Sequence, residues 1–434
     1  MEDQEEQNAT APKRLRILVV THFFPPLNSI ASHRPFSWAR TWANMGHEVH
    51  VLTTEKYPFD GSMDLQYDLS GFQTHVVPYL RGKRNTLPGK IDKGSVEKWE
   101  WLKKVSRRLR FGLGMFGDLR MLAYFKLVKA GETLLGAQHF DFVVSTYQPE
   151  VVHFVAHKLS RRFGVPWVAD YRDLWFKDIS GHAFKATSFL AGKVERHLLK
   201  QACLVSTVSK GLSHQMEERF GREVYVCYNG YIAFSDPGKS VPAIKPDLKR
   251  IVYTGRVYRK LRDPSVLFGA LGKLKKTIPN LGHLLRIDFY GYMDQWFHDL
   301  IKEYGIEDCV QLHGVVSYQE SLSAQKSADF LLFLDWMDQA TEGVLTGKLF
   351  EYLGTGRPIL SIGPNVITEA AEIIRQCKAG LVMVDEAEVR KFLERWLMAD
   401  EEALVAPDRT AVSTYSRYSQ ARALLEQIKN RLAS

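Results

Sequence analysis

Short apolar segments rich in β-branched residues recur along the chain and alternate with amphipathic stretches. The segment "RILVVTHFFPP" at 16–26 has the pattern of a buried strand that runs into a loop at a double proline. The stretch 31–46 has apolar residues near helical spacing and a closing glycine, and "HEVHVLTT" at 47–54 has the composition of a second strand. A strand, a helix and a strand in succession form a βαβ unit, which predicts a parallel sheet.

The same alternation runs through both halves of the chain. In the first half it predicts a helix near 150–163 and strands at 140–146, 166–171, 203–209 and 224–229. In the second half it predicts helices at 264–277 and 294–304, and strands at 250–255, 285–291, 310–314, 329–334, 358–363 and 380–384. The predicted fold class is therefore α/β, with two Rossmann-like domains that face each other across a cleft. Ligands of such open parallel sheets bind at the carboxyl ends of the strands.

The segment between the two halves has the composition of a linker, because "AFSDPGKSVPAIKPDL" holds three prolines and no apolar periodicity. The chain of 434 residues is also too long for one hydrophobic core. We therefore predict a first domain at 15–233, a linker at 234–248 and a second domain at 249–412. The acidic, polar start at 1–14 predicts a disordered tail rather than a secretion signal.

The composition is that of an ordinary soluble globular protein, with 45% hydrophobic and 25% charged residues. No apolar run approaches the ~18 residues that a membrane span needs. The four cysteines lie far apart without a C-x-x-C pair, so neither a disulfide framework nor a zinc site is expected, and a reducing cytoplasm is the simplest setting. The net charge of +9 permits attraction to phosphates or anionic lipid.

The stretch "TEGVLTGKLFEYLGTGRPIL" at 341–360 predicts an anion site at the start of a helix. Thr346 is placed to cap this helix, and Gly354 to end it in the left-handed conformation. The first N–H groups of a helix carry partial positive charge, and Gly343 and Gly347 would let a ligand approach the backbone closely. This arrangement suits a diphosphate.

Two charged residues follow on the same predicted helix. Lys348 adds a positive charge beside the helix start, next to Leu349, and Glu351 lies three residues further on the same face. A carboxylate at that position could accept two hydrogen bonds from the diol of a ribose. The alternative interpretation is a surface helix with an ion pair between Lys348 and Glu351.

A second cationic segment, "YTGRVYRKLRDP" at 253–264, follows a predicted strand that ends at Gly255. Its loop carries four cations, namely Arg256, Arg259, Lys260 and Arg262. Cations at the carboxyl end of a strand suit a ligand diphosphate, which arginine can bind through two hydrogen bonds. The alternative, a solvated basic loop, explains the charge but not the glycine at the cleft-facing end of the strand.

The order and spacing of these stretches resemble the GT-B glycosyltransferases of the retaining family 4, from about 16 to 430. The matching stretches are 16–26, 33–53, 167–175, 204–212, 227–231, 253–268, 347–360 and 378–384. The segment 413–434 is similar to the helix that crosses back onto the first domain in that fold. The resemblance implies a nucleoside-diphosphate-sugar donor on the second domain and an acceptor on the first.

In that family a basic residue after the "TG" glycine and another a few positions on hold the diphosphate. Here Arg256 takes the first place, and Lys260 or Arg262 must take the second because Leu261 stands where lysine is often found. The "FPP" of this chain is followed by "NSIAS" at 28–32 instead of the usual glycine pair.

The E-x7-E motif of the family is only half present. Its second glutamate maps onto Glu351, whereas its first falls on Gly343, with Glu342 one place away. No D-x-D triplet, the pattern suited to holding a metal against a diphosphate, occurs in the chain. We therefore expect no metal and no cofactor, with cations and helix amides neutralising the leaving group.

The stretch "WVADYRDLW" at 167–175 ends a strand of the first domain. We predict that Asp170, Arg172 and Asp173 orient the acceptor or stabilise a developing oxocarbenium ion, with Asp173 as the first candidate for the catalytic group. The alternative is an Arg–Asp ion pair that fixes the loop, with Trp175 as packing.

The segment 98–129 is dense in aromatic and basic residues. It interleaves Lys103, Lys104, Arg107, Arg108 and Arg110 with Trp99, Trp101, Leu102, Val105 and Leu109. This pattern predicts a helix on an anionic membrane surface, and the alternative is a helix that covers the sheet of the first domain. Nucleic acid is not an expected partner, because no nucleic-acid motif accompanies the charge.

The sequence thus predicts transfer of a hexose-type sugar from a nucleoside-diphosphate donor, with retention and without metal, to a glycan or lipid-linked acceptor. The setting would be cell-envelope or exopolysaccharide biosynthesis in the cytoplasm, at the inner face of the membrane. One alternative is a non-catalytic GT-B scaffold in an assembly complex, which the missing glutamate at 343 favours. A nicotinamide-dependent oxidoreductase is disfavoured, because neither half has G-x-G-x-x-G after its opening strand.

Overall fold

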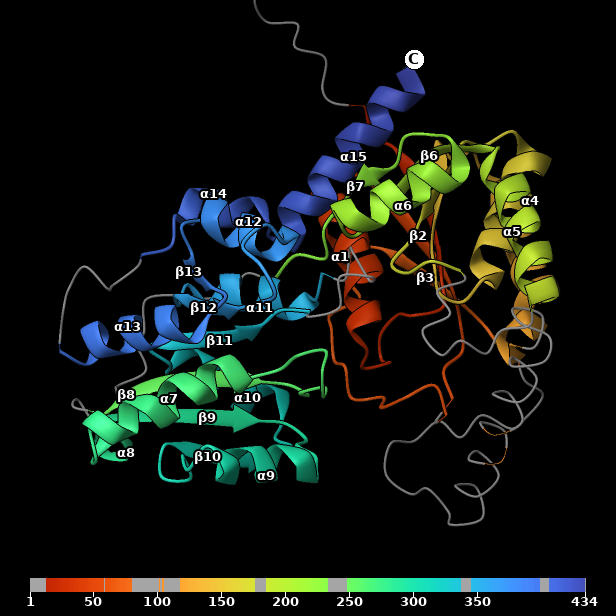
Figure 1. Cartoon of the computed structure of the whole chain (residues 1–434). Coiled ribbons are helices and arrows are strands. Elements are labelled where there is room, and N and C mark those ends of the chain that lie inside the picture. Colours follow the sequence, from red (N-terminus) through yellow and green to blue (C-terminus); the bar gives the residue numbers. More distant parts are fainter. Residues whose placement is uncertain are drawn as a thin grey trace, which may run out of the picture. The chain divides into compact units, whose positions relative to one another are not determined.

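Figure 1 shows a computed structural model of the chain. The structure describes residues 13–57, 59–79, 101, 104, 118–175, 185–232, 248–336, 345–398 and 406–433. Its chain divides into two compact units. Unit 1 holds the described residues within Met1–Val208, Leu212–Tyr228 and Ala421–Ser434, and unit 2 those within Ser209–Gly211 and Asn229–Gln420.

The sheet of unit 1 is parallel throughout, with the strand order β3-β2-β1-β4-β5-β6-β7. Its strands are β1 (Arg16–Thr21), β2 (Glu48–Thr54), β3 (Gln73–Val77), β4 (Phe142–Thr146), β5 (Trp167–Asp170), β6 (Ala202–Thr207) and β7 (Tyr225–Val226). All of them were predicted except β3, which gives no apolar signal because most of its residues are exposed or only partly buried.

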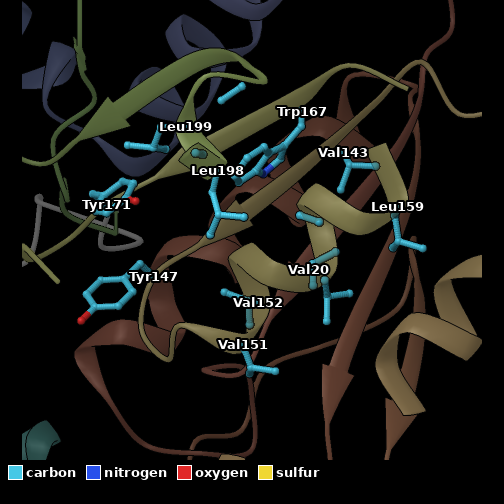
Figure 2. Packing of buried hydrophobic residues seen from close by; sticks show 14 of the residues in the cluster. Val20, Val143, Tyr147, Val151, Val152, Leu159, Trp167, Tyr171, Leu198 and Leu199 are labelled. Atoms are coloured by element: carbon cyan, nitrogen blue, oxygen red, sulfur yellow. The ribbon is translucent and has the colours of Figure 1, made fainter. Parts of the chain in front are cut away.

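Helices cover both faces of this sheet (Figure 1). On one face Leu18, Val20 and Val143 pack against α3 (Tyr124–Ala137), α4 (Val151–Phe163), α5 (Lys185–Leu199) and α6 (Lys210–Phe220), and Figure 2 shows part of this core. The opposite face packs against α1 (Ile30–Asn44) and α15 (Arg417–Ala433). The indole of Trp42 in α1 donates to the carbonyl of Ala421 in α15 over 2.8 Å, so the last helix of the chain is part of the core of unit 1.

The sheet of unit 2 is also parallel, with the order β10-β9-β8-β11-β12-β13. Its strands are β8 (Lys249–Thr254), β9 (Leu285–Tyr290), β10 (Val310–Gly314), β11 (Phe330–Leu334), β12 (Ile359–Ile362) and β13 (Gly380–Met383). All six were predicted. The apolar faces of α7 (Ser265–Thr277), α9 (Gln295–Glu303) and α13 (Glu386–Leu397) pack against Ile251, Ile287 and Leu332 on one face of the sheet. These two parallel α/β units confirm the predicted fold class of two Rossmann-like domains.

The remaining elements are mostly short. They are the 3₁₀ helix η2 (Leu119–Ala123) in unit 1, and α8 (Leu281–Leu284), α10 (Tyr318–Lys326), α11 (Gly347–Thr355), α12 (Glu369–Gln376) and α14 (Arg409–Thr414) in unit 2. Several predictions fall on residues outside the described ranges: Glu342 and Gly343, residues 1–12, almost all of the linker at 234–248, and the basic cluster within 98–117 apart from the backbone positions 101 and 104.

The helix α11 begins where the sequence predicts but ends later. Thr346 occupies the capping position in extended backbone, yet its side chain caps no N–H group. The left-handed end is Gly356, with φ of +70°, and not Gly354 as predicted. Gly354 lies inside the helix, where the ring of Tyr231 packs against it, and a β-carbon there would lie 2.6 Å from that ring. Its lack of a side chain therefore serves packing.

Candidate functional site

Two glycines shape the carboxyl edge of the sheet in unit 2. Gly255 directly follows β8 with φ of +110°, and Gly291 directly follows the neighbouring β9 with φ of +136°. A β-carbon on Gly291 would collide with the carbonyl of Gly255, and one on Gly255 would lie 2.9 Å from the Nζ of Lys348. Only glycine satisfies both the backbone angle and the space at these positions. The Lys348 side chain therefore lies directly against the turn that follows β8.

Lys348 stands at this edge without a carboxylate partner among the described residues. Its Nζ lies 3.8 Å from the ring centroid of the buried Tyr253, and within the part of the chain that the structure describes it forms no ion pair. Burial lowers the pKa of Lys348 well below its ordinary value, and the nearby Arg262 lowers it further, while Glu351 acts in the opposite direction. A bound anion would restore the full charge of this lysine.

The two predicted arginines alternate with aromatic rings. The guanidinium of Arg256 lies 5.3 Å from the ring centroid of Tyr258 and 5.4 Å from that of Tyr292. The guanidinium of Arg262 lies 5.5 Å from the centroids of both Tyr258 and Trp336. Tyr258 is thus shared by both cations. Aromatic faces hold a cation in place without neutralising it, so both guanidinium groups keep their charge for a ligand.

Few carboxylates compete for these cations. Arg256, whose side chain is half-exposed, lies 3.8 Å from Asp294, which is a long and loose ion pair. Arg262 forms no ion pair with any residue that the structure describes. Positive charge therefore outweighs negative charge at the carboxyl edge of β8, which is the electrostatic requirement of an anion site.

Glu351 lies about one turn further along α11 than Lys348 and faces the same edge. One of its oxygens accepts a hydrogen bond of 2.6 Å from Gln325, which also donates to the hydroxyl of Thr254 at the end of β8. The structure gives no ion pair between Glu351 and Lys348, so the alternative interpretation of a surface ion pair is wrong. The second oxygen of Glu351 has no hydrogen bond to a described residue and is available to a ligand.

The structure brings together most of the residues that the sequence assigned to donor binding. Gly255, Arg256, Arg262, Lys348 and Glu351 share the carboxyl edge of β8, and Gly347 is the first residue of α11. Two assigned residues lie apart from this group.

The first of these two is Leu349, which is fully buried and serves as packing within unit 2. The second is Lys260, which is exposed, has φ of +66° and has no polar partner among the described residues. Of the two candidates for the second diphosphate cation, Lys260 and Arg262, the geometry favours Arg262.

The acidic motif in unit 1 has a different character. Asp170 at the end of β5 is completely buried and accepts hydrogen bonds from both ends of the Arg34 guanidinium, at 2.6 and 3.0 Å. The hydroxyls of Thr146 and Ser206 donate to the same carboxylate at 2.7 and 2.8 Å. Asp170 has no surface or hydrogen-bonding position left for an acceptor, so the prediction that it orients the acceptor by direct contact is wrong. The alternative of a structural ion pair holds, with Arg34 as the partner instead of Arg172.

Arg172 and Asp173 follow this buried carboxylate. Arg172 donates to the carbonyl of Tyr147 over 2.6 Å, and its guanidinium lies 5.1 Å from the ring of Phe23. Burial lowers the pKa of Arg172 to about 10, so the group stays charged at neutral pH. Asp173 is exposed and forms no ion pair with Arg172. It is the one carboxylate of this motif that a ligand can reach.

Several residues of these two sites were not predicted from the sequence. Tyr253, Tyr258, Tyr292 and Trp336 give no signal beyond that of ordinary aromatic residues. Only the interleaving of Tyr258 between Arg256 and Arg262 in the sequence could have indicated a shared contact. Arg34 gives no signal either, because its partner Asp170 lies 136 residues away.

The architecture of the two units defines a class of protein. Two parallel α/β units, the second with a cationic group at the carboxyl edge of its sheet and the first completed by the C-terminal helix, are the arrangement of the GT-B glycosyltransferases. Residues 34–230 match the family model described as "Glycosyl transferase 4-like domain". This match covers less than half of the chain, so residues 34–230 are similar to a glycosyl transferase 4-like domain, and the predicted resemblance to the GT-B fold is confirmed.

Solved structures share the fold over nearly the whole chain. A glycosyltransferase from Rickettsia africae is 14% identical with a TM-score of 0.60, and the match covers 97% of this chain and 99% of that one. Anabaena Alr3699/HepE in complex with UDP is 13% identical with a TM-score of 0.60, covering 96% and 100%. The lipopolysaccharide outer core galactosyltransferase WaaB is 14% identical with a TM-score of 0.55, covering 96% and 100%. No curated protein matches the sequence.

Two further features are absent from the described residues. No helix there is both long enough and apolar enough to cross a bilayer. No group of three or more histidine, cysteine, aspartate or glutamate side chains is arranged there to hold a metal ion.

Proposed function

We propose that this protein transfers a hexose-type sugar from a nucleoside-diphosphate donor, with retention, to a glycan or lipid-linked acceptor. The observation that carries the proposal is the group of three cations, Lys348, Arg256 and Arg262, that contact aromatic rings at the carboxyl edge of β8. A diphosphate is the chemical complement of such a group. The similar fold of Anabaena HepE, which was solved with UDP, supports a uridine nucleotide as the first candidate.

The cations would act on the leaving group. When the bond between the anomeric carbon and the diphosphate oxygen breaks, the bonding electrons stay on that oxygen and add negative charge to the diphosphate. Cations that are already in place stabilise this charge without rearranging. Such preorganised charges are the main source of electrostatic catalysis. Three cations suffice for the diphosphate, so we propose that the reaction proceeds without a metal ion.

Glu351 would recognise the ribose. One oxygen is held by Gln325, which fixes the direction of the carboxylate and leaves the other oxygen for a ribose hydroxyl. Asp173 would act on the acceptor side. Its exposed carboxylate follows the buried and fully paired Asp170, so its backbone is anchored while its side chain is accessible.

A membrane surface is the partner that we propose for unit 1. Leu122 and Phe125 are 58% and 80% exposed, and the exposed Lys126 and Lys129 share the same side of η2 and α3 by helical spacing. Apolar and basic side chains on one face are typical of helices that lie on anionic lipid. The protein should co-sediment with vesicles that contain anionic lipid more than with neutral ones. Equal sedimentation would contradict this part of the proposal and favour the alternative of a helix that covers the sheet of unit 1.

The experiment that tests donor binding is calorimetric titration with UDP and with GDP. The substitution Glu351→Ala should weaken binding more than tenfold, because the ribose loses its carboxylate partner. Glu303→Ala, on the exposed face of α9 in the same unit, is the matched control and should bind like the unchanged protein. An unchanged dissociation constant for Glu351→Ala would count against the assignment.

The alternative of a non-catalytic scaffold is tested separately. A transferase hydrolyses its sugar nucleotide slowly when no acceptor is present, so release of UDP or GDP from a panel of donors by the purified protein would favour the transferase. A scaffold would release none at any protein concentration.

A further inference from the structure

Tyr253 connects the cations of the candidate donor site. It lies on β8, two residues before Gly255, and is completely buried. Its ring faces the Nζ of Lys348 at 3.8 Å from the centroid, and its hydroxyl donates to the carbonyl of Arg256 over 2.9 Å. One side chain thus contacts the lysine through its face and the backbone of the first arginine through its hydroxyl.

The position of Tyr253 is itself fixed. Its ring packs against the buried Phe289 at 5.4 Å, and β8 pairs with β9 in register at these two residues. Burial raises the pKa of Tyr253 to about 12, although Arg262 acts in the opposite direction, so the hydroxyl keeps its proton and remains a donor at neutral pH. The tyrosine is therefore a rigid part of the sheet, whereas lysine and arginine side chains are intrinsically flexible.

We propose that Tyr253 is a positioning residue, whose ring sets the position of the Lys348 Nζ and whose hydroxyl sets the backbone of Arg256 before the diphosphate binds. This inference rests on the proposed donor site. It adds the residue that orders the cations of that site before the ligand binds. A flexible lysine that is already ordered by an aromatic face loses less conformational entropy when the ligand binds. Tyr253 itself contacts no reacting atom in this account.

The test separates the two contacts of Tyr253 by substitution. Tyr253→Phe keeps the ring and removes the hydroxyl, and it should weaken UDP binding by about threefold. Tyr253→Met fills similar space without an aromatic face, and it should weaken binding by about tenfold or more. The control is Phe330→Met, which removes a buried ring at the start of β11, where Phe330 packs against Phe392 and Trp396, and should leave UDP affinity unchanged.

The decisive comparison repeats both Tyr253 substitutions in a Lys348→Met background. If the ring acts through Lys348, the difference in UDP affinity between the Phe and Met variants should disappear there, because no ammonium is left to hold. A purely structural tyrosine would keep the same difference in both backgrounds, and that result would overturn the inference. Tyr253→Leu replaces the Met variant if the latter does not fold.

The outcomes also distinguish this inference from the proposed function. If the unchanged protein binds neither UDP nor GDP, the proposed donor site fails and the role of Tyr253 fails with it. If the unchanged protein binds UDP and the Tyr253 variants bind equally well, the donor site stands and only the positioning role is overturned.

Discussion

The two charged groups at the carboxyl ends of β5 and β8 differ in how their charges are matched. Asp170 after β5 is completely buried and accepts hydrogen bonds from Arg34, Thr146 and Ser206. Lys348 and Arg262 beside β8 have no carboxylate in ion-pair contact within the described ranges, and aromatic rings hold them instead. Both groups stand at the end of a parallel strand where ligands usually bind, yet only the second leaves charge available.

The contrast shows that charge at a strand end does not by itself indicate a binding site. A buried ion pair whose hydrogen bonds are all satisfied stabilises the fold around it and presents nothing to a ligand. The guanidinium groups that contact aromatic faces keep their charge and lose part of their hydration, and Lys348 regains its full charge when an anion binds, so all three gain from a bound anion. Substitutions in unit 1 should therefore change stability, and those in unit 2 should change binding.

The largest effect is expected for Asp170→Asn. This change leaves the Arg34 guanidinium buried without a counter-charge, so the free energy of unfolding should fall by about 3–5 kcal/mol. Thermal and denaturant unfolding would measure it. The matched change in unit 2, Lys348→Met, should not lower stability, because it removes a partly buried cation with no carboxylate partner among the residues that the structure describes. Equal destabilisation by both variants would refute the distinction between the two groups.

Glu195 provides a second test in unit 1, because it is a buried carboxylate with fewer partners than Asp170. It lies on α5 with an Arg219 nitrogen at 2.8 Å, and burial raises its pKa to about 7. Between pH 4.5, the ordinary pKa of a glutamate, and about pH 7, the Glu195 carboxyl is therefore protonated in the folded protein and ionised in the unfolded chain. Stability should fall over this pH range by up to about 3 kcal/mol from this group.

The neutral isostere Glu195→Gln should flatten this part of the stability curve. Denaturant unfolding of both proteins at pH 5 and pH 8 measures the difference. If the stability of the variant falls between pH 5 and pH 8 as much as that of the unchanged protein, another group is responsible.

The next effect concerns Lys348 and is expected in binding. Lys348→Met should weaken UDP binding by at least tenfold, or about 1.4 kcal/mol, because the diphosphate loses one of its cations. UDP should also raise the lowered pKa of Lys348, so binding should take up protons and become weaker as the pH rises toward the ordinary lysine pKa. Calorimetry in two buffers of different ionisation enthalpy measures this uptake, and Lys348→Met should abolish it.

The smallest effect is expected at Lys260, whose φ of +66° favours glycine. Lys260→Gly should raise the free energy of unfolding by about 1 kcal/mol or less, because the strain of a side chain in the left-handed region is relieved. UDP affinity should change by less than about threefold. A tenfold loss of affinity would restore Lys260 as the diphosphate cation in place of Arg262.

The strands were almost entirely predictable from the sequence, because parallel strands buried on both faces are continuous apolar runs. The six strands of unit 2 and the helices α1, α4, α7 and α9 lie within a few residues of their predicted positions. The strand β3 was not predicted, since an edge strand that is only partly buried carries no such run. The wrong end of α11 has a similar cause: Gly354 satisfies a contact with Tyr231, which is distant in sequence.

The candidate site was predictable only where its residues are local in sequence. Arg256 and Arg262 share a loop, and Lys348 and Glu351 share a helix. The spacing along the sequence was therefore enough to predict that the members of each pair lie close together. The aromatic partners and the Arg34–Asp170 pair are tertiary contacts, which a single sequence does not record. The same limit explains why Asp170 was assigned to an acceptor: the sequence shows the carboxylate but not the four donors that enclose it.

The central claim is that Lys348, Arg256 and Arg262 of unit 2 form a diphosphate site. Calorimetric titration with UDP, and with uridine as the ligand that lacks the diphosphate, tests it on the unchanged protein and on the double variant Lys348→Met, Arg262→Met. The account predicts that UDP binds much more tightly than uridine to the unchanged protein and that the double variant loses this preference. Equal affinity for UDP and uridine, or a preference that survives in the double variant, would contradict it.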